Sequence, residues 1–137
     1  MIIFWKKVVR SFGFAGEGIV SSSLERNMRV HLLATAIVIP LSVWAGISRT
    51  EWFTLIILIG LVISAEMVNT AVEELANLLR DELKLSYVAT KRARDIAAGA
   101  VLVMAFVALI VGTSILTPRI LDKVSPPQIP SLSTMQY

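Results

Sequence analysis

Three long apolar runs constrain this chain more than any other feature of its sequence. One covers residues 96–116 without a charged side chain, and another covers residues 30–47 with His31 as its single ionisable group. Each is about twenty residues long, which is the length that an α-helix needs to cross the hydrocarbon core of a bilayer. The pattern therefore predicts an all-α membrane protein rather than a soluble domain.

The third run is shorter and extends into polar sequence. Residues 52–65 are apolar, which gives a helix of only about 21 Å at 1.5 Å per residue. Such a helix has to continue through Glu66 and Asn69 before it leaves the membrane. We expect one domain of residues 1–116 with three transmembrane helices, at about residues 28–47, 52–79 and 95–116.

The composition agrees with the membrane class. Hydrophobic residues make up 55% of the chain and charged residues 17%, against about 25% charged in an average protein. The chain has no cysteine, which excludes disulfides, thiolate metal sites and cysteine nucleophiles. A net charge of +3 is modest for a nucleic-acid-binding protein, and we expect no nucleic-acid partner.

The basic residues predict the orientation. With three spans, ten of the thirteen lysines and arginines fall on one side, and the positive-inside rule makes that side cytoplasmic. The amino terminus is then cytoplasmic and the carboxyl terminus external.

Residues 2–23 are predicted to form an amphipathic helix on the membrane surface. At 100° per residue, an arc of about 140° carries the apolar side chains of Phe4, Trp5, Val8, Val9 and Phe12. The opposite face is basic, with Lys6, Lys7 and Arg10. Such a helix lies on an anionic leaflet with its apolar face down, and a disordered basic leader is the alternative.

Three other features are interpreted more simply. Glycines at positions 13, 16 and 18 predict an interruption of the first helix before Ser21. The proline-containing segment 117–137 is expected to be unstructured. His31 is expected to make an interfacial hydrogen bond rather than to act in catalysis.

The polar residues of the middle span form one stripe. With Glu66 at 0° on a helical wheel, Asn69 falls at about 300°, Glu73 at about 340° and Asn77 at about 20°. Solvation at the end of the span is an alternative explanation for Glu73 and Asn77. Glu66 is a candidate for function, because a carboxylate next to hydrocarbon is costly unless it is paired or protonated.

Other charged residues are expected at the same cytoplasmic face. Glu25 precedes the first span and Asp95 opens the third, with Lys91, Arg92 and Arg94 around them. Oxygen ligands without histidine or cysteine suit Mg²⁺, and arginine and lysine suit phosphates. The residues thus indicate phosphoryl transfer at a membrane surface.

Three separated motifs resemble the small bacterial integral-membrane lipid kinases, the family of diacylglycerol kinase and the undecaprenol kinases. Residues 65–73, Ala-Glu-Met-Val-Asn-Thr-Ala-Val-Glu, look like the family signature. Residues 25–31, Glu-Arg-Asn-Met-Arg-Val-His, are similar to the stretch before the first span in the undecaprenol-kinase branch. Residues 94–101 resemble the start of its third span, and the similarity extends from about residue 11 to residue 112.

The resemblance implies a lipid kinase in the bacterial inner membrane, built as a homotrimer with active sites shared between neighbouring subunits. It would use ATP and Mg²⁺ to phosphorylate a lipid alcohol. Undecaprenol, giving undecaprenyl phosphate, is the expected substrate, and diacylglycerol, giving phosphatidic acid, is the alternative. Carried over position by position, Glu66 would be the general base and Asn69 would support the site.

The resemblance also implies which residues would bind the nucleotide and the metal. Glu25 and Glu73 would hold the Mg²⁺ and the nucleotide, and Arg94 and Asp95 would contact ATP. The family usually has aspartate where Asn77 stands and lysine where Arg94 stands, and the segment between positions 77 and 95 is about three residues longer here.

Two noncatalytic interpretations remain open at this point. One is a membrane protein that uses its carboxylates as a proton or cation relay. The clustering of the acidic residues at one membrane face, and the absence of a polar stripe in the third span, argue against it. The other is an inactive paralogue, which Asn77 and Arg94 suggest.

Overall fold

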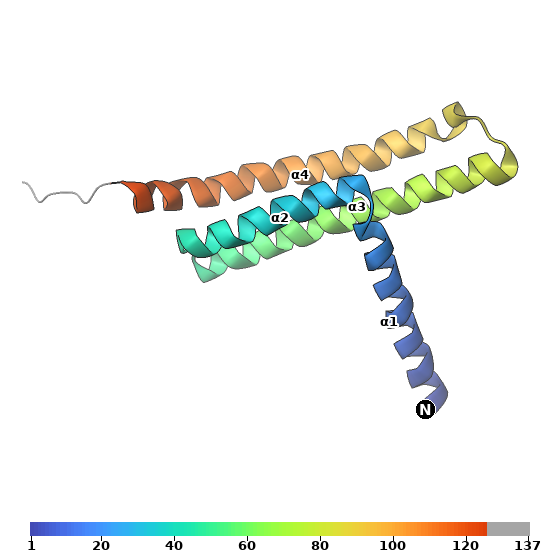
Figure 1. The fold of residues 1–137 in the computed structure, drawn as a ribbon, viewed down its shortest axis with the longest axis horizontal. Coiled ribbons are helices and arrows are strands. Elements are labelled where there is room, and N and C mark those ends of the chain that lie inside the picture. Colours follow the sequence, from blue (N-terminus) through green and yellow to red (C-terminus); the bar gives the residue numbers. More distant parts are fainter. Residues whose placement is uncertain (126–137) are drawn as a thin grey trace, which may run out of the picture.

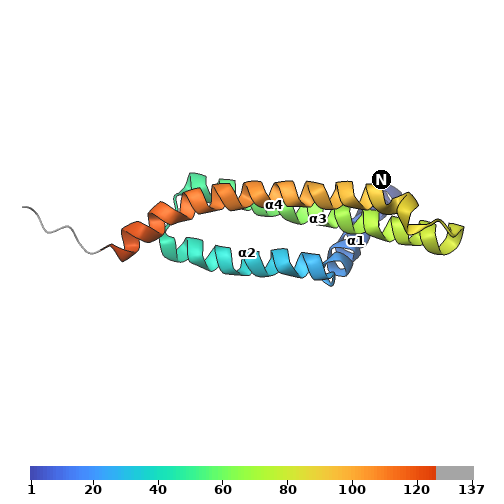
Figure 2. The ribbon, with the colours of Figure 1, turned by 90° about the horizontal axis from the view of Figure 1, so that it is seen from above.

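The computed structural model of the chain describes residues 1–125 as four helices, in the order α1 (Ile2–Ser23), α2 (Arg26–Ala45), α3 (Arg49–Leu83) and α4 (Tyr87–Val124). Helices α2, α3 and α4 run side by side, and α1 leaves them at a steep angle (Figure 1). Seen from above, α3 and α4 form a long hairpin, and α2 lies along part of it (Figure 2). The predicted all-α class is confirmed.

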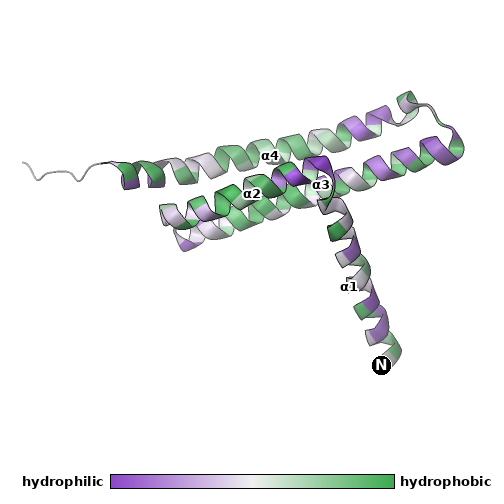
Figure 3. Ribbon diagram, viewed as in Figure 1, coloured by the Kyte–Doolittle hydropathy of each residue, from purple (hydrophilic) through white to green (hydrophobic). Residues whose placement is uncertain are grey.

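Three of the helices, α2, α3 and α4, are long and apolar enough to cross a membrane. Their middle parts are hydrophobic, while the turn between α3 and α4 and the start of α2 are hydrophilic (Figure 3). Helices α3 and α4 have 35 and 38 residues and are longer than the predicted spans. About twenty residues are enough to cross the hydrocarbon, so both helices extend beyond it. The turn of the hairpin therefore projects beyond the start of α2 (Figure 1).

The connection between α2 and α3 is fixed by two end signals. Gly46 adopts a left-handed conformation, with φ at 70°, and so ends α2. Ser48 begins α3 with a capping box, in which its hydroxyl accepts a bond from the Glu51 backbone N–H and its own N–H donates to the Glu51 carboxylate. A small core of Ala45, Ile47, Leu55 and Leu116 packs around this end of the bundle.

The same end holds an ion pair between α3 and α4. Arg119 donates from Nη2 to both carboxylate oxygens of Glu51, at 3.0 and 3.2 Å, and from Nε at 3.3 Å. We call Glu51 and Arg119 the far-side clamp, because they lie at the opposite end of the hairpin from its turn. Hydrogen bonds from Ser48 and then the Arg119 guanidinium lower the pKa of the Glu51 carboxyl.

The structure corrects two predictions about the ends of the chain. Residues 117–124, expected as part of an unstructured tail, continue α4 through Pro118, because Arg119 binds Glu51 and Ile120 packs on the core. The remainder of that predicted tail, residues 126–137, lies outside the described residues. The predicted interruption of α1 is also wrong, since the helix runs through its glycines to Ser23.

Candidate active site

The predicted polar stripe lies on one uninterrupted helix, α3. Glu66 and Asn69 are each only 2% exposed, and Thr70 is also buried. Asn69 donates a hydrogen bond from Nδ2 to Oε1 of Glu73 at 3.1 Å, one turn further along the helix. The stripe is therefore turned towards the protein at Glu66, Asn69 and Thr70, and the bond from Asn69 joins the partly exposed Glu73 to it.

A polar cavity of about 210 Å³ lies where the junction of α1 and α2 meets α3. Glu25 reaches it because this residue, in extended conformation, separates the two helices as the N-cap of α2. Glu66 and Glu73 reach it from α3. Three of the predicted site residues thus line one cavity, although Glu25 precedes the other two by more than forty positions in sequence.

The wall of this cavity also contains residues that the sequence reasoning did not select. They are Arg26, Asn27 and Thr70. Thr70 follows Glu66 by four residues, which places both on one helix face, so helical spacing could have found it. Arg26 supplies a positive charge among three carboxylates, and only the fold reveals this arrangement.

Helix α4 contributes Arg94 and Asp95 outside the cavity. Arg94 donates a hydrogen bond from Nη2 to Oδ1 of Asn77 at 2.8 Å, and its guanidinium carbon lies 5.6 Å from the centroid of the Tyr87 ring. Asp95 is exposed and forms an ion pair with Lys91, which raises the pKa of the lysine. The structure therefore brings Arg94 to the α3 stripe but leaves Asp95 exposed and outside the cavity.

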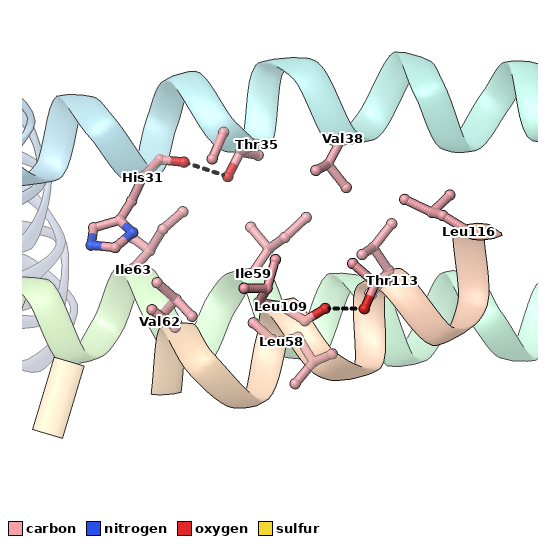
Figure 4. Close-up of a pocket in the computed structure, with 15 residues that line it drawn as sticks. His31, Thr35, Val38, Leu58, Ile59, Val62, Ile63, Leu109, Thr113 and Leu116 are labelled. Carbon is pink, nitrogen blue, oxygen red and sulfur yellow. Dashed lines mark hydrogen bonds between the residues drawn. The ribbon is translucent and has the colours of Figure 1, made fainter. Parts of the chain in front are cut away.

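An apolar cavity of about 260 Å³ lies between α2, α3 and α4 (Figure 4). It extends from His31, towards the start of α2, to Leu116, and its side chains are almost all aliphatic. The hydroxyls of Thr35 and Thr113 bind backbone carbonyl oxygens of their own helices, at 2.9 and 2.7 Å, and so offer no free donor to a ligand. His31 is the polar residue at one end.

The polar cavity is called the acidic cavity below, because Glu25, Glu66 and Glu73 line it. Its residues fit a divalent cation that is held in part by the phosphates of a substrate. Within residues 1–125, no group of three histidine, cysteine or acidic side chains is close enough to hold a metal by itself. Mg²⁺, however, usually takes one or two carboxylates and completes its shell with phosphate oxygens and water. Glu25 and Glu73 supply two carboxylates, and the buried Oδ1 of Asn69 has no hydrogen-bond partner in this part of the chain.

Comparison with known proteins gives the family. Residues 13–116 match the family model of prokaryotic diacylglycerol kinase, and this segment contains every predicted site residue. The chain belongs to this family. It is similar to the undecaprenol kinase of Bacillus subtilis (strain 168), with 36% identity over 112 residues that cover 81% of this chain and 89% of the relative. None of the solved structures matches it.

Membership of this family makes the protein a lipid kinase associated with the membrane, with ATP as its phosphate donor. The predicted family and enzyme class are confirmed. The role of each site residue, the use of Mg²⁺ and the trimer stay predictions.

Proposed function

We propose that this protein phosphorylates undecaprenol to undecaprenyl phosphate, with ATP as donor, at the cytoplasmic face of a bacterial inner membrane. The observation that carries the proposal is the cavity in which Glu25, Glu66 and Glu73 meet at the polar end of an apolar bundle. The name of the Bacillus subtilis relative supports the choice of lipid. The distribution of lysine and arginine supports the orientation, with the amino terminus inside.

Glu66 is the general base in this proposal. Its carboxylate accepts the proton of the lipid hydroxyl while the hydroxyl oxygen attacks the γ-phosphorus of ATP. A new bond forms between oxygen and phosphorus, the bond from that phosphorus to the bridging oxygen breaks, and ADP leaves with the electron pair. Burial of Glu66 supports this role, since a buried carboxylate gains by accepting a proton.

Glu25 and Glu73 would hold a Mg²⁺ ion that is bound together with the phosphates of ATP. Such an ion, when bound, neutralises part of the charge on the transferred phosphoryl group. Asn69 orients the Glu73 carboxylate through its hydrogen bond, which is the usual task of a residue behind a metal ligand. Arg94 contacts the phosphates from α4.

The apolar cavity receives the first part of the isoprenoid chain. It lies between the membrane-crossing helices, and α3 lines both this cavity and the acidic one. Ile63, in the apolar wall, precedes Glu66 by one helical turn, or about 5 Å. A chain held there would bring its terminal hydroxyl towards the carboxylate.

We also propose that the enzyme is a homotrimer with shared active sites and that α1 lies on the membrane surface. Asp95 supports the sharing, because it is exposed and does not line the cavity of its own chain, and its ion pair with Lys91 lies at a surface that a neighbouring subunit can reach. The large exposed side chains of α1, among them Phe4, Trp5 and Phe12, support membrane contact.

The test is a lipid-kinase assay with the purified protein in mixed micelles. Undecaprenol and diacylglycerol are offered separately with radiolabelled ATP and Mg²⁺, and the ratio of kcat/KM for the two lipids is measured. We expect undecaprenol to be preferred. A preference for diacylglycerol would overturn the substrate assignment, and transfer to neither lipid would overturn the proposed reaction.

A further inference from the structure

The side chain of Arg94 is held between α3 and α4 by two neutral partners. One is the amide oxygen of Asn77, which accepts its hydrogen bond across the hairpin at 2.8 Å. The other is the ring of Tyr87, seven residues earlier on α4 and so on the same helix face, 5.6 Å from the guanidinium carbon. We call Asn77, Tyr87 and Arg94 the turn-side clamp, because they lie next to the turn of the hairpin.

Neither partner neutralises the charge of Arg94. Among residues 1–125, no carboxylate lies within ion-pair distance of it, whereas the nearby Arg80 and Lys91 are paired with Asp81 and Asp95. The Nε atom of Arg94 is buried and has no hydrogen-bond partner within the same residues. A partly buried guanidinium without a counter-charge attracts an anion, and its planar fork of donors matches phosphate oxygens.

The turn-side clamp is adjacent to the acidic cavity. Asn77 follows Glu73 by four residues on α3, a spacing that sets side chains about 5–6 Å apart on one helix face. Arg94, bound to Asn77, is therefore about one helical turn from a residue that lines the cavity. A nucleotide whose phosphates lie beside Glu73 would come within reach of this guanidinium.

We propose that Asn77 and Tyr87 are positioning residues that orient Arg94 while leaving its charge free for the phosphates of ATP. This inference rests on the proposed function. The aspartate that is usual at this position in the family stands opposite a lysine, which pairs with carboxylates as a point charge. Opposite Arg94, an aspartate at position 77 would accept the same hydrogen bond but would also form a bidentate ion pair and compete with the phosphates. The neutral amide supplies the geometry without that competition.

A purely structural role makes the opposite prediction. If the bond between Asn77 and Arg94 served only to join two helices, a carboxylate at position 77 would do so at least as well, because charge-assisted hydrogen bonds are stronger than neutral ones. The substitution Asn77→Asp therefore separates the two roles, since it preserves the size of the side chain and the acceptor oxygen bound by Arg94, while it adds a negative charge and exchanges the amide group for a second oxygen.

The kinetic test compares Asn77→Asp with the full-length wild-type enzyme at saturating lipid and Mg²⁺. We expect the KM for ATP to rise about tenfold, equivalent to about 1.4 kcal/mol of lost binding. We expect kcat and the KM for the lipid to stay within about twofold, which is under 0.5 kcal/mol. The matched control is Asp81→Asn, which changes one charge in the exposed pair with Arg80 and should leave the KM for ATP unchanged.

A second pair of variants tests the ring. Tyr87 is half exposed, so its replacement does not disturb a packed core. Tyr87→Phe keeps the aromatic face and should preserve the wild-type KM for ATP. Tyr87→Leu removes it and should raise this KM about threefold, the scale of an exposed cation–π contact.

Binding of a fluorescent ATP analogue without lipid completes the test. Asn77→Asp should weaken this binding by the same factor as it raises the KM. An unchanged KM and an unchanged affinity in Asn77→Asp would overturn the inference. So would a parallel fall in kcat, in affinity for the lipid and in thermal stability, because the variant would then disturb the fold as a whole and not the phosphate contact of Arg94. If the wild type phosphorylated no lipid, the proposed function would fail, while nucleotide binding would still decide the role of the clamp.

Discussion

Glu66 combines a carboxylate with almost complete burial. Its residue surface is only 2% exposed, and Asn69 on the same helix is equally buried. A buried ionisable group without a permanent ion pair carries a cost in folding, and such groups are concentrated at functional sites. Glu73 is different, since it is partly exposed and is oriented by Asn69. This difference supports the proposed division of tasks between the two glutamates of the stripe, with Glu66 as base and Glu73 as metal ligand.

Replacing Glu66 by glutamine tests the first task. Glutamine keeps the size of the side chain but accepts no proton, so we expect kcat to fall about 10²- to 10⁴-fold, the usual contribution of a general base. The measurement is the initial rate at saturating ATP and lipid, with the exposed Glu82→Gln as control. Full activity in Glu66→Gln would exclude its role as base.

Replacing Glu73 by glutamine tests the second task. Loss of a carboxylate ligand should raise the Mg²⁺ concentration needed for half-maximal rate at least tenfold, since even residues behind a metal ligand cost 10- to 100-fold in affinity. The neighbouring Glu74→Gln removes the same charge from an exposed position and should leave the titration unchanged. Superimposable Mg²⁺ titrations for both variants would contradict the assignment.

At the scale of elements, the α3–α4 hairpin carries most of the site and is joined near both ends. The turn-side clamp links Asn77 to Arg94, and the far-side clamp links Glu51 to Arg119. A slip of one helix along the other by a turn would break both contacts. The two contacts therefore fix the register of α3 against α4, and the junction of α1 and α2 completes the cavity from the side.

The substitution Arg119→Ala should lower the melting temperature by a few degrees at pH 7 and leave kcat unchanged, because the far-side clamp is remote from the cavity. The pKa of Glu51 is lowered in the folded protein, so its stabilising effect is present above the unfolded value of about 4.3 and is lost as the pH falls below it. The difference in melting temperature between wild type and variant should accordingly shrink below about pH 4.3. A difference that stays constant from pH 7 to pH 3 would contradict this account.

The sequence predicted helix number and class well, because apolar runs of about twenty residues have few other structural solutions. The hydropathy pattern, however, underestimated the lengths of α3 and α4. Residues 80–83 continue α3 and residues 87–94 begin α4 in polar sequence, where hydropathy carries no signal and end signals such as Ser86 decide. The prediction for residues 117–124 is wrong because a proline such as Pro118 usually marks the end of a helix, whereas here a contact with Glu51, distant in sequence, holds the segment.

The candidate site was predicted in part. Helical spacing was sufficient to group Glu66, Asn69 and Glu73, since all three lie on one helix. The meeting of Glu25 with them depends on how α2 packs on α3, which periodicity does not specify. The bond between Asn77 and Arg94 could not be predicted either, because the sequence places Asn77 at the end of the stripe and the resemblance makes Arg94 an ATP contact, but neither pairs the two residues.

At the scale of the whole molecule, shared active sites make a quantitative prediction. If Asp95 serves the cavity of a neighbouring subunit, Glu66→Gln and Asp95→Asn damage different halves of a site. Random mixing of the two inactive variants should then restore about one quarter of the wild-type activity, because each interface combines two subunits independently. The measurement is the kinase rate after unfolding and refolding the mixture. Mixed preparations as inactive as the separate variants would show that each chain works alone.

The two clamps also set a length. Asn77 follows Glu51 by 26 residues on α3, and Arg119 follows Arg94 by 25 residues on α4. At 1.5 Å per residue these segments measure about 39 and 38 Å, against about 30 Å for the hydrocarbon of a typical bilayer. The segments exceed that thickness by about 8 to 9 Å, and this excess lies on the turn side, because the cavity proposed for the phosphates marks the cytoplasmic face. The far-side clamp then lies at one edge of the hydrocarbon, and the turn-side clamp lies beyond the other edge.

The distance between the two clamps therefore exceeds the hydrocarbon thickness of an ordinary bilayer. In bilayers of phospholipids with very long acyl chains, hydrocarbon thicker than about 38 Å would reach the charged groups of the clamps, and immersion of those groups is costly. We expect the reconstituted enzyme to keep its activity across short and medium acyl chains and to lose it above that thickness. The acyl-chain length of the surrounding phospholipids would then change the rate of phosphate transfer, although these phospholipids do not enter the active site.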